Sequence, residues 1–189
     1  MGLLSKKNKP SQKAYAVVTG AGSGIGRSFA LELAKRGGAV TRADIDLSSA
    51  QETVDLIQSM TSSSAYAVHC DVGLKESVHA LAEQAEQLLG HPVTLLINNA
   101  GVGLGGKFDE VSLEDWQWCM HVNLWGVIHG CHYFVPKFKQ QGSGAIINVA
   151  SAAGYTAAPE MTAYNVTKSS VLALSETLAS ELQAYNIAV

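Results

Sequence analysis

The sequence predicts an α/β fold of the Rossmann type, a doubly wound parallel sheet with helices on both faces. Short apolar segments alternate along the chain with longer segments whose apolar residues recur at helical spacing. The first apolar segment ends in the glycine-rich stretch Thr19–Gly26, which leads directly into a helical pattern. Strands that alternate with helices of this length form βαβ units with right-handed crossovers, and such units place their strands side by side in one parallel sheet.

Strands are expected where apolar runs are too short to form helices. Five such runs are found, at residues 14–19, 39–43, 65–69, 93–97 and 145–149, and residues 186–189 look like the start of a sixth strand. The segments between and after them predict helices with one apolar face, at about residues 25–35, 48–60, 74–88, 113–138 and 162–185. Ser48 is expected to cap the second helix, because a serine side chain can accept the free N–H groups of a first turn.

The composition bounds the class of protein. The chain has 189 residues, of which 47% are hydrophobic and 15% charged, with a formal net charge of −3, as in an ordinary soluble domain. The only basic cluster lies in residues 1–13, which are expected to form a flexible tail, so nucleic acid is not an expected partner. No apolar run approaches the roughly 20 residues of a membrane span. Residues 14–189 are expected to form one dinucleotide-binding domain.

The cysteines indicate the compartment. Three are scattered along the chain, at Cys70, Cys119 and Cys131. They form neither a disulfide framework nor a CxxC metal motif. A reducing, cytoplasmic location fits this pattern.

A nucleotide-binding end is predicted where the first strand meets the first helix. Glycines in Thr19–Gly26 allow the backbone to turn sharply and to approach a pyrophosphate, which would rest at the positive end of the helix. Asp44 ends the second strand, where an acid can bind an adenosine ribose. A carboxylate there repels the 2′-phosphate of NADP, so NAD is the favoured cofactor. Arg42, two residues earlier, would either attract such a phosphate or pair with a nearby acid.

The strict GxGxxG spacing occurs elsewhere, at residues 101–106 after the fourth strand. No obvious helix opens directly behind it, so the context that gives this motif its meaning is absent. We interpret residues 101–106 as a flexible loop beside the cofactor site.

Three side chains predict proton-transfer chemistry: Ser151, Tyr164 thirteen residues later, and Lys168 one helical turn beyond. A phenol is a poor acid or base near neutrality, since its unperturbed pKa is about 10. An ammonium group on the same helix face favours the phenolate form. A hydroxyl from a neighbouring loop can then hold a substrate oxygen while the tyrosine moves its proton.

The same tyrosine–lysine spacing occurs a second time, at Tyr133 and Lys137, without a comparable context. Met120, which has no hydroxyl, lies thirteen residues upstream of Tyr133. Pro136 lies between the pair, and a helix is expected to end there. We therefore interpret Tyr133 as a packing residue and Tyr164 as the reactive one.

Two further groups of side chains in the fourth predicted helix are interpreted as structural. His129 and His132 are three residues apart, but no third ligand is evident, so a polar or packing role is favoured and no metal is expected. Trp116, Trp118 and Trp125 are interpreted as core or interface residues.

Together these motifs resemble the short-chain dehydrogenase/reductase family, in its classical NAD(P)-dependent form, from about Ala14 to the last residue. The family's glycine loop is matched by Thr19–Gly26, and its Asn-Asn-Ala-Gly stretch is matched by Asn98–Gly101. The resemblance implies a cofactor site made of Gly20, Ser23, Gly24, Ile25, Gly26, Asp44, Asp71, Val72, Asn98, Ala100, Gly101, Tyr164 and Lys168.

The resemblance also assigns catalytic roles to four residues. Tyr164 would donate the proton in ketone reduction and accept it in alcohol oxidation, while Lys168 would hold the nicotinamide ribose hydroxyls. Ser151 would position the substrate oxygen, and Asn123 would anchor a water that relays protons to Lys168. The implied activity is hydride transfer between NAD(H) and a secondary alcohol or ketone.

Family members of this type usually continue for several dozen residues beyond the position of Val189. The chain is therefore expected to be C-terminally truncated, with the last strands of the sheet missing. The alternative function is a non-catalytic dinucleotide-binding module or an inactive truncated subunit. The helices predicted at 113–138 and 162–185 match those that commonly pair between family subunits, so a homo-oligomer, dimer or tetramer, is expected.

Overall fold

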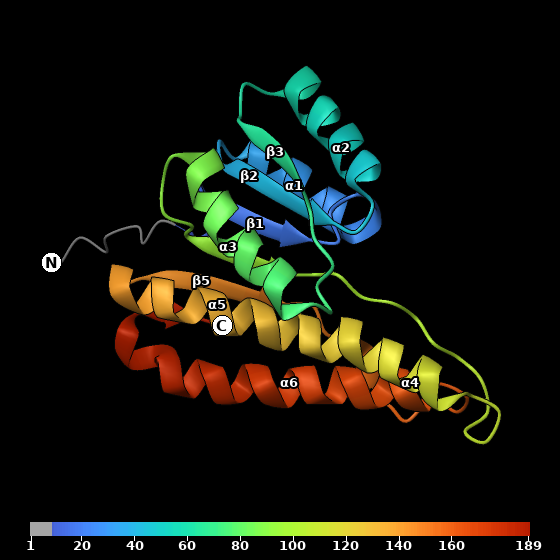
Figure 1. Ribbon diagram of the computed structural model, residues 1–189. Helices are drawn as coiled ribbons and strands as arrows, with labels where there is room; N and C mark the ends of the chain where they lie inside the picture. The colour runs from blue at the N-terminus through green and yellow to red at the C-terminus, as the bar shows by residue number, and fades with distance from the viewer. Residues whose placement is uncertain (1–8) are drawn as a thin grey trace, which may run out of the picture.

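Six parallel strands form one sheet in the computed structural model, which describes residues 9–189 (Figure 1). The strands are β1 (Tyr15–Thr19), β2 (Ala39–Asp44), β3 (Ala65–His69), β4 (Leu95–Asn98), β5 (Gly144–Asn148) and β6 (Ile187–Ala188). Their order across the sheet is β3-β2-β1-β4-β5-β6, which is that of a doubly wound fold. The predicted fold class is confirmed, with small shifts at the strand ends. Of the tail expected at residues 1–13, residues 1–8 lie outside the described part of the chain.

Helices cover both faces of the sheet, and α3, α5 and α6 form the layer in front of it in Figure 1. The bounds are α1 (Gly24–Lys35), α2 (Leu47–Met60), α3 (Lys75–Leu89), α4 (Leu113–Met120), η1 (His121–Trp125), α5 (Gly126–Gln141), η2 (Ala152–Gly154), α6 (Thr162–Leu182) and η3 (Gln183–Tyr185). α1 and α2 share a core with Val18 and Ile97, whereas α3, α5 and α6 share a core with Val17 and Leu96. Adjacent strand residues thus serve opposite cores, because side chains alternate along a strand.

The single helix predicted for residues 113–138 is interrupted and is longer than expected. The π turn η1 separates α4 from α5, and such turns occur frequently at functional sites. The predicted helix end at Pro136 is wrong, because α5 continues to Gln141. Phe134 and Phe138, which flank the proline, are both fully buried. Pro136 has no N–H to donate to the preceding turn, and this costs one helical hydrogen bond. Burial of the two phenylalanine rings offsets that loss and stabilises the helix.

The cap of α2 also differs from the expectation. Asp46, and not Ser48, caps this helix, since its carboxylate accepts the N–H groups of Ser48 and Ser49 at 3.0 and 3.3 Å. Ser48 lies in the first turn, one residue after the start of the helix. Aspartate and serine are both good caps, so residue type alone does not distinguish Asp46 from Ser48. The extended backbone at Asp46 decides where the helix begins.

The order of strands reverses between β1 and β4, and this reversal creates a crevice. The chain builds β2 and β3 on one side of β1, and then β4 to β6 on the other side. At such a switch point the loops that leave the two strands diverge, and ligands bind between them. The loops are nevertheless tied at their base, because the Thr19 hydroxyl accepts the N–H groups of Asn99 and Ala100 at 3.0 and 3.1 Å.

Candidate active site

The carboxyl ends of the strands surround a cavity of about 780 Å³. Most of the residues predicted from the sequence line it, namely Gly20, Ser23, Gly24, Ile25, Asp44, Asp71, Val72, Ala100, Gly101, Ser151, Tyr164 and Lys168. Three of the predicted residues do not line it: Gly26, Asn98 and Asn123. The fold therefore brings segments from the first strand to the last long helix together around one site.

The glycine-rich loop presents backbone N–H groups at the start of α1. Ser23, Gly24 and Ile25 are exposed at this helix end, where N–H groups lack intrahelical partners and the helix dipole is positive. Gly20 and Gly24 have φ values of +62° and +53°, which favour glycine. Gly26 is buried behind the loop, and a Cβ there would overlap the carbonyl oxygen of Gly20. Gly26 therefore lets α1 approach the loop and does not face the cavity.

The carboxylate of Asp44 is fixed at the cavity wall by two backbone groups. One of its oxygens accepts the N–H of Gly22 at 2.8 Å, and the other accepts the N–H of Asp46 at 3.0 Å. Both donors are neutral, so the carboxylate presents an uncompensated negative charge to the cavity. The carboxylate can therefore accept hydrogen bonds from a bound ligand.

The position of Arg42 agrees with neither of the two roles predicted from the sequence, a contact with a phosphate or a pair with a nearby acid. Its side chain is fully buried, and its three guanidinium nitrogens have no hydrogen-bond partner within residues 9–189. It does not line the cavity of Asp44. Burial lowers the pKa of Arg42 to about 10, against the attraction of Asp55. Neither a phosphate contact nor a close pairing with an acid is supported by this placement.

The segment after β3 forms the next part of the wall. The N–H of Cys70 donates to the carbonyl of Asp44 at 2.9 Å, which connects the ends of β2 and β3. Asp71 accepts the N–H of Gly73 at 2.9 Å and is thereby oriented within its own turn. Cys70 is 2% exposed, and burial raises the pKa of its thiol to about 11. The thiol is therefore neutral near pH 7 and lines the cavity as a small apolar group.

Asn98 and Asn99 differ from the expectation. The side chain of Asn98 is buried and donates to Asn148 Oδ1 at 2.8 Å, away from the cavity. Asn99 lines the cavity instead, and its Nδ2 donates to the carbonyls of Thr19 and Gly20 at 2.9 and 3.1 Å. A direct cofactor contact by the Asn98 side chain is therefore not supported. The signal in the sequence is position: Asn98 is the last residue of β4, so its side chain points to the same face of the sheet as that of Leu96.

Ser151, Tyr164 and Lys168 all line the cavity. Ser151 stands at the start of η2, where its hydroxyl accepts the N–H of Ala153 at 3.2 Å. Lys168 Nζ lies 5.7 Å from the centre of the Tyr164 ring and donates to the carbonyl of Val149 at 2.8 Å. Lys168 is 4% exposed, and burial lowers the pKa of its amine from the usual 10.5. The structure thus places in the lining of one cavity the three groups that the sequence selected for proton transfer.

Asn123 lies in the π turn η1, behind the cavity wall. Its fully buried carboxamide bonds the backbone of Val102 twice, accepting the N–H at 2.7 Å and donating to the carbonyl at 2.8 Å. A Cβ on Gly101 would lie 3.2 Å from Asn123 Oδ1 and 3.5 Å from Lys168 Nζ. Asn123 and Lys168 therefore approach the same glycine, with Asn123 shaping the loop that lines the cavity.

The loop at residues 101–106 forms no helix, and Gly101, Val102 and Gly103 line the cavity. Its interpretation as a loop beside the site is confirmed, while its flexibility stays a prediction. Tyr133, which sequence context separated from Tyr164, packs against the core with its ring 4.9 Å from that of His79.

Several lining residues were missed by sequence reasoning. They are Ile45, Cys70, Asn99, Val102, Gly103, Trp118, Val122, Val149 and Ala150. Trp118 is 46% exposed and lines the cavity, so it is not a core residue, while its assignment to an interface stays a prediction. Trp118 and Val122 lie one turn apart on consecutive helical segments. That spacing alone does not distinguish a cavity wall from a core face.

Comparison with known proteins identifies the family. The family model described as short chain dehydrogenase matches residues 14–189. The chain belongs to the short chain dehydrogenase family. A solved family structure, a short chain dehydrogenase/reductase from Burkholderia phymatum in complex with NAD, superposes with a TM-score of 0.91 at 39% identity, covering 95% of this chain and 64% of that chain. Cyclohexanol dehydrogenase from Acinetobacter sp. (strain SE19) is 38% identical, covering 92% of this chain and 68% of its own length.

The chain spans only part of the length of its relatives in the family. Probable oxidoreductase EphD from Mycobacterium tuberculosis (strain ATCC 25618 / H37Rv) is 36% identical over 90% of this chain, but the match covers 28% of the length of EphD. Family membership assigns the chain to a family of oxidoreductases with a Rossmann-like fold. It does not specify the substrate or the choice between NAD and NADP.

The histidines of α5 contact neighbouring groups. His129 Nδ1 lies 2.9 Å from the carbonyl oxygen of Val72, and the His132 ring meets the Tyr133 ring edge-on.

Within residues 9–189, no three histidine, cysteine, aspartate or glutamate side chains gather as a metal site would require. Among the helices of this same stretch, none combines the length and the apolar character needed to cross a membrane.

Proposed function

We propose that the chain transfers a hydride between NAD(H) and a secondary alcohol or ketone, with Tyr164 as the general acid/base. The observation that carries this proposal is that Ser151, Tyr164 and Lys168 line the same cavity as the glycine-rich loop. A site that only held a nucleotide would not need a phenol, an amine and a hydroxyl in its lining. Those three groups are what proton transfer to a carbonyl oxygen requires.

The residues of the cavity fit a dinucleotide. The exposed start of α1 suits a pyrophosphate, and the fixed carboxylate of Asp44 suits ribose hydroxyls. The cavity volume of about 780 Å³ lies within the range usual for ligand sites. The B. phymatum relative was solved with NAD bound, which supports the same cofactor here.

The chain's own groups divide the chemistry between them. Bound NAD would supply the hydride chemistry. Tyr164 would give a proton to the substrate oxygen in reduction and take it back in oxidation, while Ser151 would hold that oxygen in place. Lys168, whose Nζ donates to the carbonyl of Val149 and lies 5.7 Å from the centre of the Tyr164 ring, would hold the nicotinamide ribose hydroxyls beside the phenol. Val149 and Ala150 add apolar side chains to the lining of the same cavity.

The proposal is tested by titrating the purified protein with NADH and assaying it against a panel of secondary alcohols and ketones with both nicotinamide cofactors. We expect binding of NADH and turnover of at least one panel member. Binding without any turnover would support the alternative, a non-catalytic dinucleotide-binding module. Absence of binding would contradict both functions.

Asp44 is expected to set the preference for NAD. Its carboxylate repels a 2′-phosphate, so Asp44→Ala is expected to raise the affinity for NADPH relative to NADH by about tenfold. The Kd values for both reduced cofactors, from quenching of protein fluorescence, measure this change. An unchanged ratio would contradict the role of Asp44.

A matched variant controls for net charge. Asp55 lies on α2 and does not line the cavity. Asp55→Ala removes the same charge from the same region of the fold, and we expect it to leave the ratio of the two Kd values within about twofold of the parent. A similar rise in both variants would indicate a long-range charge effect in place of a local one.

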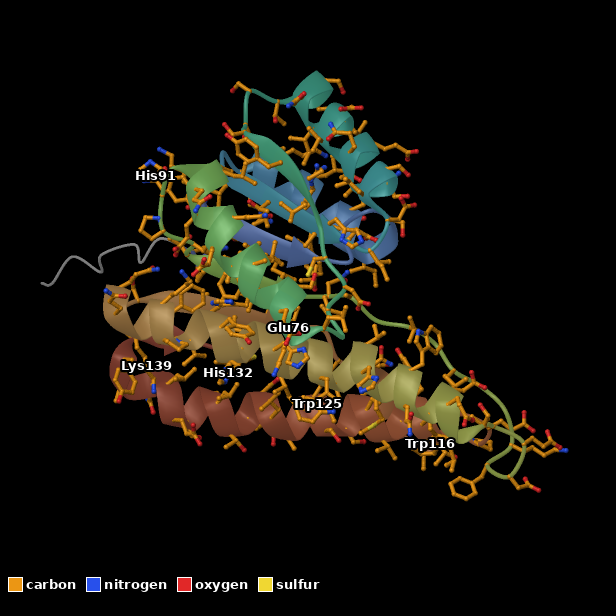
Figure 2. The ribbon with its side chains drawn as sticks, in the orientation of Figure 1. Glu76, His91, Trp116, Trp125, His132 and Lys139 are labelled. Atoms are coloured by element: carbon orange, nitrogen blue, oxygen red, sulfur yellow. The ribbon has the colours of Figure 1, made fainter. Side chains whose placement is uncertain are left out.

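We also propose that the chain forms homo-oligomers through the helix layer of α4, α5 and α6. Trp125 and Val166 are 46% and 42% exposed on this layer. Figure 2 shows Trp125 where the row of α4 and α5 runs alongside α6, with Trp116 near one end of that row. Large apolar side chains that remain exposed on neighbouring helices are typical of an interface.

Oligomerisation is tested by light scattering at several protein concentrations. We expect the parent protein to be a dimer or tetramer, and Trp125→Glu to shift it toward the monomer because the variant places a charge in an apolar contact. Leu56→Glu is the control, since Leu56 is an exposed apolar residue of α2, on the opposite face of the sheet. A parent protein that stays monomeric at high concentration would contradict the proposal.

A further inference from the structure

Thr167 is a fully buried polar residue in the helix that carries the reactive pair. It lies three residues after Tyr164 and directly before Lys168. Its hydroxyl donates to the carbonyl of Tyr164 at 2.8 Å. Threonines in helices often bond back to the preceding turn in this way, so this bond taken alone is structural.

The hydroxyl oxygen of Thr167 also accepts a second, long-range hydrogen bond. Asn123 Nδ2 lies 3.3 Å from the Thr167 hydroxyl oxygen, across 44 positions of the chain. A hydroxyl has one hydrogen and two lone pairs. Since the hydrogen is donated to Tyr164, Thr167 accepts this bond from Asn123. The contact joins the π turn η1 to helix α6 directly behind the cavity wall.

The carboxamide of Asn123 has two N–H groups and three neighbouring acceptors. One N–H is donated to the carbonyl of Val102 at 2.8 Å. The other lies between the Thr167 hydroxyl and the Cys119 sulfur, both at 3.3 Å. A thiol sulfur is a weak acceptor, so the hydroxyl is the stronger partner. Thr167 therefore helps to orient the carboxamide that holds the backbone of Val102.

We propose that Thr167 is a positioning residue: through Asn123 it ties helix α6, with Tyr164 and Lys168, to the loop at Val102. This inference rests on the proposed function, because it concerns the two halves of that site. Val102 and Tyr164 both line the cavity, and they come from two different segments, the loop after β4 and helix α6. The hydrogen bond between Asn123 and Thr167 would set the distance between the Tyr164 hydroxyl and a ligand bound at the loop. The rate of the catalysed reaction depends on such placement of the reacting groups.

The bridge is tested on the whole chain with three variants. Thr167→Val keeps the shape and removes the hydroxyl, whereas Thr167→Ser keeps the hydroxyl. Thr41→Val is the matched control, because Thr41 is equally buried and its hydroxyl has no partner within residues 9–189. Amide hydrogen exchange by NMR reports the Val102 N–H, which donates to Asn123. NADH titration and steady-state kinetics report the consequence for the site.

We expect Thr167→Val to speed exchange at Val102 by about tenfold and to lower kcat by about tenfold, with the Kd for NADH within about twofold of the parent. Thr167→Ser should restore both quantities, and Thr41→Val should change neither. Unchanged exchange at Val102, or equal acceleration at every core amide, would overturn the inference. Faster exchange at Val102 with an unchanged kcat would overturn the positioning role. A parent chain without turnover would overturn the proposed function, and exchange at Val102 would still decide whether the bridge exists.

Discussion

Tyr164→Phe is expected to lower kcat by about a thousandfold and to leave the Kd for NADH within about twofold of the parent. The variant keeps the ring and removes only the hydroxyl that would exchange a proton with the substrate oxygen. Among the described residues that line the cavity, Tyr164 is the only tyrosine, so no other phenol of the site replaces it. Steady-state kinetics with the best substrate of the panel, together with NADH titration, measure the two effects.

The chain contains its own control for this experiment. Tyr133 and Lys137 repeat the spacing of the reactive pair, but Tyr133 packs beside His79 and Lys137 Nζ donates to Glu86 at 2.7 Å. Neither residue lines the cavity. Tyr133→Phe is therefore expected to retain kcat within about twofold. If Tyr164→Phe kept more than about a tenth of the parent kcat, Tyr164 would not be the general acid/base.

Gly26→Ala is expected to lower the free energy of unfolding by about 2–3 kcal/mol and the affinity for NADH by about tenfold. The added Cβ would overlap the carbonyl oxygen of Gly20, which belongs to the backbone and cannot rotate away. Either α1 or the glycine-rich loop must then move, and the loop lies at the cavity wall. Denaturant titration measures the first effect and NADH fluorescence the second.

Gly103→Ala is the matched control for the added methyl group. Gly103 also lines the cavity, but a Cβ there has no heavy atom within 4 Å, and its φ is not in the left-handed region. We expect this variant to leave both stability and the Kd for NADH close to the parent values. Equal losses in the two variants would show that the position of Gly26 has no special steric role.

Much of the fold follows from patterns that act over a few residues. Apolar runs and helical stripes locate the strands and helices, because burial of one face is decided by the local period of the side chains. The glycine-rich loop could be predicted for the same reason, since a turn at Gly20 and Gly24 needs only the backbone freedom of those residues. The spacing of Tyr164 and Lys168 places both on one helix face before any packing is known.

The candidate site was harder to predict where neighbouring residues compete for one position. Asn98 and Asn99 are chemically identical, and the pairing of Asn98 with Asn148 between β4 and β5 turns one amide away from the cavity. The burial of Arg42 depends likewise on α2, which covers its strand from elsewhere in the chain. Such choices depend on sheet register and on contacts between distant segments, neither of which has a local pattern.

The sequence by itself determined the class of fold, and it predicted the end of the sheet for a nucleotide and the three groups proposed for proton transfer. Only the tertiary structure decided that Asn123 supports the loop from behind, that Trp118 forms part of the wall, and that α5 continues through Pro136. The physical reason is that the period of apolar side chains shows which face of a helix or strand is buried. It does not show which other segment packs against that face, because that contact joins residues far apart in the sequence.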